Sequence, residues 1–249
     1  LSIIQDQRSV ELSQKPLKKL TNRAARRLPG VVAMSFNDAR RHEWSALVSA
    51  HAGLGQLYTW KGDKLNDTVL RPPNEQSPII RSCAITRCGN FVLVGTARGG
   101  LYKANLQSGL WRASAPTAHV GSIEGIVTDI LEKVAVTCGL DGFVRAWDLS
   151  DLSLIREVNV GVPLANAVLH REAGLVAMSG DDWTIRVFDV LTLTLSREFR
   201  GHGNAVTALS FSADAKWIVS ASADCTVRTW DIVSAHCIDA FMCPKPAVA

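Results

Sequence analysis

The feature that most constrains this chain is a repeat with a spacing of 41–44 residues. The run TVRTWD at 226–231 ends on an aromatic residue followed by an aspartate, and two earlier runs end in the same way. A period of this length predicts structural units that each bury their apolar faces against their neighbours. The predicted units end near residues 60, 104, 147, 188 and 230.

The interior of each unit is rich in β-branched and aromatic residues. In the last unit, turn residues separate four short runs, at 205–211, 216–222, 226–231 and 236–241. Such runs bounded by turn signals are typical of strands. No stretch after residue 42 shows the 3.6-residue period of an amphipathic helix. We therefore predict an all-β chain of about five four-stranded units.

Polar residues keep the same register in two of the units. Each has a histidine, a hydroxyl residue and an aspartate at 28, 10 and 6 positions before a tryptophan: His202, Ser220, Asp224 and Trp230, and His119, Thr137, Asp141 and Trp147. A buried indole N–H needs an acceptor, and a hydroxyl can accept it and donate onward to an imidazole. We predict a structural hydrogen-bond network in each unit, ending on the aspartate. These units resemble the WD40 family of β-propellers, which carry Gly-His near the start and Trp-Asp near the end.

The other three units depart from this pattern. The fourth keeps Asp182 but has apolar residues at the other positions, and the first and second lack the set altogether. We predict that apolar packing and strand pairing hold these units without such a network. The residues at the corresponding positions are Val160 and Met178 in the fourth unit, Gln76, Arg98 and Ala104 in the second, and Val32, Ala50 and Leu54 in the first.

A Ser-His-Asp set also invites interpretation as a hydrolase. Here the serine is predicted to bind an indole, and the sequence has no GxSxG turn. We predict no enzymatic activity, no cofactor and no small-molecule substrate. The six cysteines show no metal-ligand spacing, so we expect reduced thiols and no metal site. No apolar run approaches the length of a membrane span.

Charge divides the chain into two parts. Residues 1–41 hold nine Lys/Arg and three Asp/Glu, whereas residues 42–249 hold eighteen and twenty. We assign 1–41 to the end of a preceding blade plus a basic inter-blade segment, and 42–249 to propeller blades. The segment contains Lys15, Lys18, Lys19, Arg23, Arg26 and Arg27. These side chains could contact RNA phosphates or an acidic partner; the alternatives are a solvated insertion or a nuclear-localisation patch.

Closure of the ring is a further expectation. WD40 rings usually have about seven blades, and only five units are visible here. We expect this chain to be a fragment of a longer protein whose other parts complete the ring. The alternative is that a partner completes it.

The segments that depart from the WD40 pattern carry a second resemblance. These segments are ELSQKPLKKL (11–20), HEWSALVSAHAGLGQLYTW (42–60), VLRPP (69–73), CGNFVLVGTARGGLYKANLQSG (88–109) and TAHVGSIEGI (117–126). In this order they resemble the U3 small nucleolar RNA-associated protein 21 family. The stretches 88–91 and 106–109 carry most of that resemblance, which extends over nearly the whole chain.

The resemblance implies a nucleolar scaffold. Members of that family have two propellers and a C-terminal helical domain, and belong to the UTP-B subcomplex of the small-subunit processome. It implies a role in ribosome biogenesis and 18S pre-rRNA processing. The implied partners are other UTP-B propeller subunits, the U3 snoRNP and the 5′ external transcribed spacer of pre-rRNA.

The alternative function is that of a WD40 adaptor in another complex, such as a ubiquitin-ligase substrate receptor. A receptor should present arginine and aromatic residues together on one ring face. Arg145, Arg186 and Arg228 recur two positions before the aromatic residue, and we expect them to lie at blade edges rather than in a pocket.

Overall fold

The computed structural model describes residues 28–61, 64–73 and 78–245. These residues form twenty strands arranged in five four-stranded sheets, and no helix occurs within the described ranges. In each sheet the four strands follow one another in the sequence and pair in an antiparallel meander. The predicted all-β class and four-stranded unit are therefore confirmed.

The first three sheets cover residues 31–159. The first sheet contains β1 (Val31–Phe36), β2 (Leu47–His51), β3 (Leu57–Lys61) and β4 (Lys64–Leu70). The second contains β5 (Ile80–Ile85), β6 (Phe91–Thr96), β7 (Leu101–Asn105) and β8 (Trp111–Ala115). The third contains β9 (Ile123–Thr128), β10 (Val134–Gly139), β11 (Phe143–Asp148) and β12 (Leu154–Asn159).

The last two sheets cover residues 164–242. The fourth sheet contains β13 (Leu164–His170), β14 (Leu175–Gly180), β15 (Ile185–Asp189) and β16 (Leu195–Phe199). The fifth contains β17 (Val206–Phe211), β18 (Trp217–Ser222), β19 (Thr226–Asp231) and β20 (Cys237–Met242). The four runs predicted for the last unit differ from these strands by at most one residue at an end.

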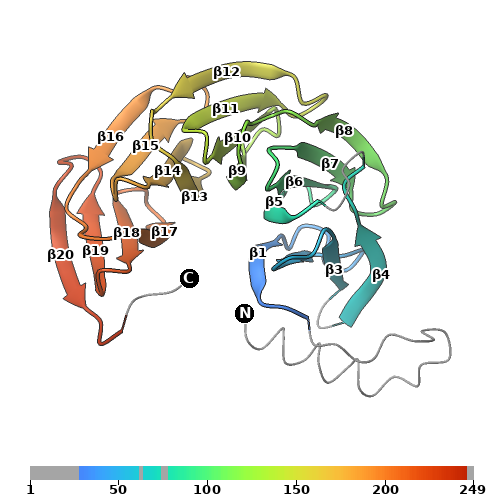
Figure 1. The fold of residues 1–249 in the computed structure, drawn as a ribbon, viewed down its shortest axis with the longest axis horizontal. Coiled ribbons are helices and arrows are strands. Elements are labelled where there is room, and N and C mark those ends of the chain that lie inside the picture. Colours follow the sequence, from blue (N-terminus) through green and yellow to red (C-terminus); the bar gives the residue numbers. More distant parts are fainter. Residues whose placement is uncertain (1–27, 62–63, 74–77, 246–249) are drawn as a thin grey trace.

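The sheets are arranged as the blades of a propeller. Figure 1 shows an open arc in which the first strand of each sheet lies on the inside and the fourth on the outside. The inner strands β1, β5, β9, β13 and β17 are neighbours in that order. The first and fifth sheets stand at the two ends of the arc.

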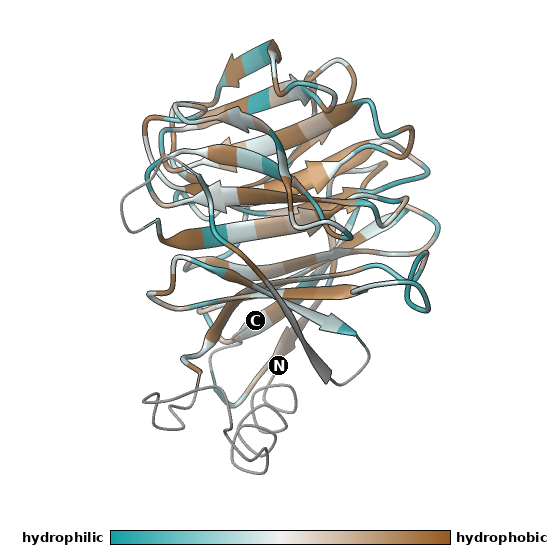
Figure 2. Ribbon diagram, turned by 90° about the vertical axis from the view of Figure 1, so that its right-hand side faces the viewer, coloured by the Kyte–Doolittle hydropathy of each residue, from teal (hydrophilic) through white to brown (hydrophobic). Residues whose placement is uncertain are grey.

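Apolar clusters between neighbouring sheets hold the arc together. One such cluster lies at each of the four joints between consecutive sheets. Figure 2 shows the apolar residues concentrated on the stacked strands and the polar residues in the loops. Because successive side chains of a strand point to opposite faces, each sheet contributes one row of residues to the joint on either side. Burial of these apolar side chains away from water is the largest favourable contribution to the free energy of folding.

The first sheet starts earlier than the sequence suggested. β1 lies within the segment 1–41, which we assigned to the end of a preceding blade plus a basic inter-blade segment, yet it pairs with β2. Its alternating burial is weak, with Val32, Met34 and Phe36 exposed. The boundary at residue 41 was drawn on charge, which carries no information about strand pairing.

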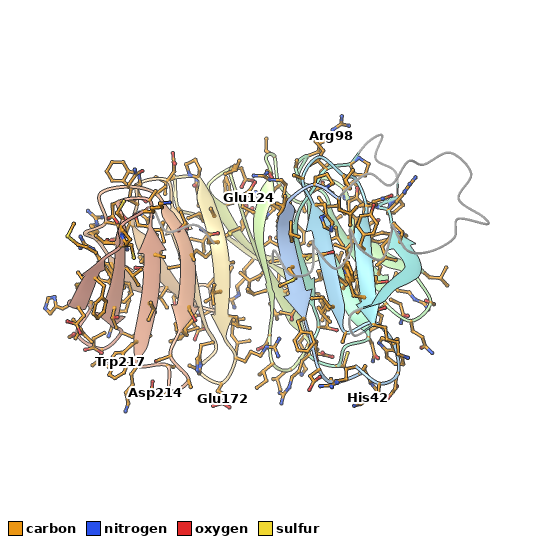
Figure 3. All side chains as sticks on the ribbon, turned by 90° about the horizontal axis from the view of Figure 1, so that it is seen from below. His42, Arg98, Glu124, Glu172, Asp214 and Trp217 are labelled. Atoms are coloured by element: carbon orange, nitrogen blue, oxygen red, sulfur yellow. The ribbon has the colours of Figure 1, made fainter. Side chains whose placement is uncertain are left out.

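The arc has two faces that are useful for locating the loops. One face, called the network face below, carries the turns between the second and third strands of each sheet, such as those of Arg98, Asp141 and Asp224. The opposite face carries the turns between the first and second strands, including those of Glu172 and Asp214. Figure 3 shows Arg98 on one side and Glu172 and Asp214 on the other.

Candidate functional site

The fifth sheet brings together the four residues predicted to form a network. Trp230 Nε1 donates to Ser220 Oγ at 2.7 Å, and Ser220 Oγ lies 2.7 Å from His202 Nε2. His202 Nδ1 lies 2.9 Å from Asp224 Oδ2. Each atom has a partner if the Ser220 hydroxyl donates to Nε2 and Nδ1–H donates to the carboxylate. The set therefore ties two strands to the loop before β17 and to the β18–β19 turn.

The third sheet brings its four predicted residues into the same arrangement. Trp147 Nε1 donates to Thr137 Oγ1, which lies 2.8 Å from His119 Nε2. His119 Nδ1 lies 2.8 Å from Asp141 Oδ1. Arg145 adds an ion pair to the other carboxylate oxygen at 2.8 Å. This network is thus the more highly charged of the two.

Burial and hydrogen bonding set the protonation of these groups. Burial alone would raise the pKa of Asp141, but the hydrogen bonds from Arg145 and His119 outweigh it and lower that pKa to about 2. Burial lowers the pKa of His119 even though Asp141 opposes the shift. At Asp224, desolvation is outweighed by hydrogen bonds from Thr226, the Gly203 N–H and His202, which hold its pKa well below the usual range. Both carboxylates are therefore ionised at neutral pH.

The network geometry speaks against a hydrolytic role for these residues. Ser220 and Thr137 are completely buried. Each oxygen already accepts an indole N–H. A nucleophilic hydroxyl must reach a substrate carbonyl, and neither of these can. The Ser-His-Asp and Thr-His-Asp sets join strands and loops instead.

The first sheet contains a network that the sequence analysis missed. Trp60 Nε1 donates to Ser49 Oγ at 2.8 Å, and Ser49 Oγ lies 3.1 Å from His51 Nε2. His51 Nδ1 lies 2.8 Å from the Pro29 carbonyl oxygen, which takes the place of the aspartate. The prediction that this unit lacks such a network is therefore wrong.

Strand register explains the error. Ser49 pairs with Tyr58, two residues before Trp60, just as Ser220 pairs with Arg228, two residues before Trp230. One extra residue between the hydroxyl and the tryptophan moved Ser49 out of the fixed sequence offset. The signal available in the sequence was Ser-x-His at the end of a strand that precedes Tyr-Thr-Trp.

The second and fourth sheets use apolar residues at these positions, as predicted. Ala104 and Met178 are completely buried, and Phe188 is nearly so. Ala104 belongs to the cluster between the first two sheets, and Met178 and Phe188 to the cluster between the third and fourth. Asp182 remains in the fourth sheet and pairs with Arg186 at 2.6 Å. Gln76 lies outside the described residues.

The recurring arginines differ in their partners. Arg145 pairs with Glu157 as well as Asp141, and Arg186 pairs with Glu198 as well as Asp182. Arg228 pairs across the sheet with Ala240, where the other two sheets have a glutamate. Within the described residues, no ion pair engages Arg228. Two of the three arginines are thus held by acids of their own sheet.

Other predicted groups lie beyond what the structure describes. The basic residues Lys15, Lys18, Lys19, Arg23, Arg26 and Arg27 fall outside the described residues. The described part of the chain contains no group of three or more His, Cys, Asp or Glu residues that could hold a metal ion. No helix in that part is long and apolar enough to cross a membrane. The six cysteines are unpaired.

Comparison with known proteins extends the sequence resemblance. The family described as the WDR36/Utp21 second beta-propeller domain matches residues 1–249. The chain is 34% identical over 254 residues to the "U3 small nucleolar RNA-associated protein 21 homolog" of Schizosaccharomyces pombe, covering 98% of the chain. It is also 34% identical to "WD repeat-containing protein 36" of Homo sapiens, over 90% of the chain. The same identity is found with "U3 small nucleolar RNA-associated protein 21" of Saccharomyces cerevisiae, over 96% of the chain.

The chain spans only 26–28% of the length of these relatives. The family match nevertheless runs from the first residue to the last. The five observed sheets have the architecture that a propeller family requires. The chain belongs to the family of WDR36/Utp21 second β-propeller domains.

Proposed function

We propose that this chain is a non-catalytic scaffold in the small-subunit processome, acting in ribosome biogenesis with the U3 snoRNP in the nucleolus. The observation that carries the proposal is the match of the whole chain to the WDR36/Utp21 propeller family. Two of the similar relatives have names that associate them with U3 small nucleolar RNA. A role in 18S pre-rRNA processing follows from that association.

The geometry supports a scaffold rather than an enzyme. The histidine and hydroxyl side chains that could perform acid–base chemistry are buried in networks that link strands to loops. What the fold offers to partners is a broad surface of loops and strand edges. Its proposed partners are the other propeller subunits of UTP-B.

The alternative of a ubiquitin-ligase substrate receptor is not favoured. It would need arginines free to grip a short motif on one ring face. Arg145 and Arg186 are instead engaged by Asp141 and Asp182. The names of two of the relatives also associate those proteins with U3 small nucleolar RNA.

The experiment that tests the proposal is purification of the full-length protein from cells followed by sequencing of the bound RNA. We expect enrichment of U3 RNA and of pre-rRNA from the 5′ external transcribed spacer. Recovery of a ubiquitin-ligase core without RNA would overturn the scaffold proposal.

A direct RNA contact through the basic segment 15–27 is a finer part of the proposal. Six positive charges without an acid in this segment suit sequence-independent binding to phosphates. Changing all six to serine should reduce RNA crosslinking. It should also make binding less dependent on salt concentration, because fewer phosphate contacts release fewer counterions when RNA binds. A matched control exchanges each lysine for arginine and each arginine for lysine, which preserves the charge. Equal crosslinking by the serine variant and the control would refute the contact.

A further inference from the structure

A pocket between the third, fourth and fifth sheets has no role in the networks described above. Its volume is about 300 Å³, and its apolar walls include Leu140, Pro163, Leu164 and Val206. These residues come from the β10–β11 turn, the loop into β13, β13 itself and β17. The pocket therefore opens where three blades meet, at the network face.

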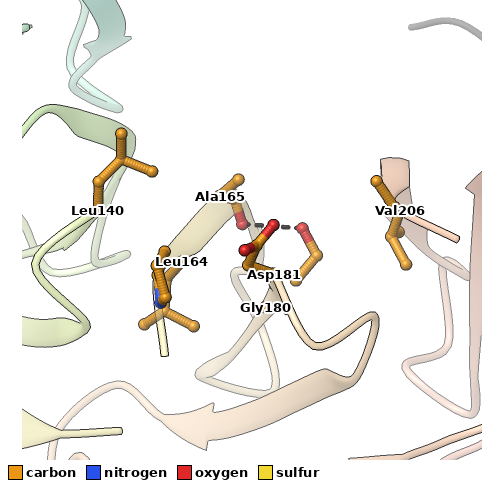
Figure 4. A pocket seen from close by; sticks show the side chains of 9 residues that line it. Leu140, Leu164, Ala165, Gly180, Asp181 and Val206 are labelled. Atoms are coloured by element: carbon orange, nitrogen blue, oxygen red, sulfur yellow. Dashed lines mark hydrogen bonds between the residues drawn. The ribbon is translucent and has the colours of Figure 1, made fainter. Parts of the chain in front are cut away.

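The uncharged polar side chains in and beside the pocket are hydrogen-bonded within the protein. Ser179 Oγ donates to the Ala165 carbonyl at 3.1 Å, as the dashed line in Figure 4 shows. The Asn166 side-chain amide donates to Ser179 Oγ at 3.3 Å and to the Val206 carbonyl at 2.9 Å. These groups do not call for a ligand.

Asp181 is different. Its backbone N–H donates to the Pro163 carbonyl at 2.9 Å, which fixes the turn. Its side chain is exposed, and among the described residues its carboxylate has neither a hydrogen-bond nor an ion-pair partner. Figure 4 shows this side chain among the apolar residues, with Leu164 to one side and Val206 to the other. A negative charge without a partner among the described residues thus lies beside the apolar walls of the pocket.

Among the residues that the structure describes, no cation pairs with this carboxylate. Arg186, which comes from the neighbouring strand, is held by Asp182 at 2.6 Å and by Glu198 at 3.1 Å. Arg200 pairs with the same Glu198. An incoming cation would meet no competing positive charge from these side chains.

We propose that this pocket binds a lysine or arginine side chain from an extended segment of a partner protein. The aliphatic stem of such a side chain covers the apolar walls, and its charged end meets Asp181. Because the carboxylate repels phosphate, the pocket disfavours nucleic acid. The proposal goes beyond the scaffold function by assigning a docking point and the chemistry of its partner.

The binding of short capped peptides to the purified full-length protein tests the proposal. One peptide carries a single central lysine, a second carries arginine, and a third carries norleucine, which keeps the stem but lacks the charge. We expect fluorescence polarisation to show at least fivefold tighter binding of the charged peptides than of the norleucine peptide. Asp181→Asn should abolish this difference while leaving the melting temperature unchanged.

Two further variants separate the charge from the apolar wall. Glu172→Gln removes a carboxylate on the opposite face of the same sheet and should leave all three affinities unchanged (Figure 3). Leu140→Ser removes an exposed apolar side chain from the wall and should reduce the affinities of the lysine and norleucine peptides by the same factor. Three outcomes would each overturn the proposal. The wild type could bind the lysine and norleucine peptides equally well, Asp181→Asn could bind the lysine peptide as tightly as the wild type does, or no binding could be measured. No RNA is present in the assay, so its outcome is independent of the proposed processome role.

Discussion

The individual residues that hold this fold act through buried hydrogen bonds with few alternatives. Ser220 is completely buried and receives the indole N–H of Trp230 while facing His202. The fourth sheet packs Met178 and Phe188 at the same positions without any polar atom to satisfy. A fully hydrogen-bonded network and a fully apolar set are both stable, but replacing one member of the network by an apolar residue leaves a buried polar group without a hydrogen-bond partner.

Ser220→Ala should therefore cost about 2–3 kcal/mol of unfolding free energy, because it leaves the Trp230 N–H and one nitrogen of His202 without a partner. Adding Trp230→Phe should cost less than the sum of the two single changes, since phenylalanine has no N–H to satisfy. Urea denaturation of the wild type, the two single variants and the double variant measures this coupling. Strict additivity would contradict the network.

The pH dependence of stability should report on Asp141. Its pKa is about 2 in the folded protein against 3.8 as the ordinary value, so the unfolded chain takes up a proton at this group first as the pH falls. The stability it contributes is complete above about pH 5 and is lost as the pH falls towards 2. After allowance for solvent screening at the ring face, we expect about 1 kcal/mol. Asp141→Asn should remove that part of the slope in unfolding measurements between pH 4 and pH 2; an unchanged slope would show that the carboxylate is not coupled to folding.

At the scale of strands and sheets, contacts between consecutive blades add to the strand pairing within each blade. Lys103 on β7 is buried, and its Nζ donates to the Leu149 carbonyl of the third sheet at 2.6 Å. The same ammonium lies 4.3 Å from the centre of the Phe91 ring. Burial lowers the pKa of Lys103, with Asp148 opposing the shift. This lysine thus links the second sheet to the third through a carbonyl, while an aromatic ring of its own sheet contacts the ammonium group.

Lys103→Met should reduce the unfolding free energy by about 1–2 kcal/mol, because methionine keeps most of the apolar stem but loses the charge-assisted hydrogen bond. Lys103→Ala should cost more, because it also leaves a cavity between the sheets. Thermal or urea unfolding of both variants checks the order. If the alanine variant were as stable as the methionine variant, the stem would contribute nothing to this joint.

The strands and their grouping were predictable from sequence, because period and turn chemistry are local. The four positions of the fifth-sheet network were also predictable, since Ser220, Asp224 and Trp230 lie within one unit and His202 at its start. Lys103 was not, because its partner Leu149 belongs to the next unit and no local pattern links them. Ser49 and His51 were missed because strand register, not sequence offset, places a side chain opposite a tryptophan. The pocket of Asp181 needs three sheets to exist at all.

At the scale of the whole molecule, the fourth and fifth sheets differ in coverage: the fifth sheet packs on one face of the fourth, whereas in the described arc no further sheet lies on the corresponding face of the fifth. Phe199 on β16 is 1% exposed, and it packs in the cluster between the fourth and fifth sheets. Phe241 on β20 pairs with Val227 just as Phe199 pairs with Ile185, but Phe241 is 59% exposed. Val219 and Ala177 show the same contrast, at 38% and 0%. The face of the fifth sheet that points away from the fourth thus has apolar residues at the positions that pack against the next sheet elsewhere in the arc, but here they are exposed.

We expect another sheet of the full-length polypeptide to cover this face. In the isolated 249-residue chain, Phe199→Ala should cost about 3–5 kcal/mol of unfolding free energy, because it leaves a cavity in a packed joint. Phe241→Ala should cost well under half of that, because most of the ring is already in water. In the full-length protein the two substitutions should become similarly costly, and hydrogen exchange across β20 should slow relative to the isolated chain. If Phe241→Ala stayed mild and β20 exchanged equally fast in both, the face would be a free surface, and closure of the ring by the same polypeptide would be excluded.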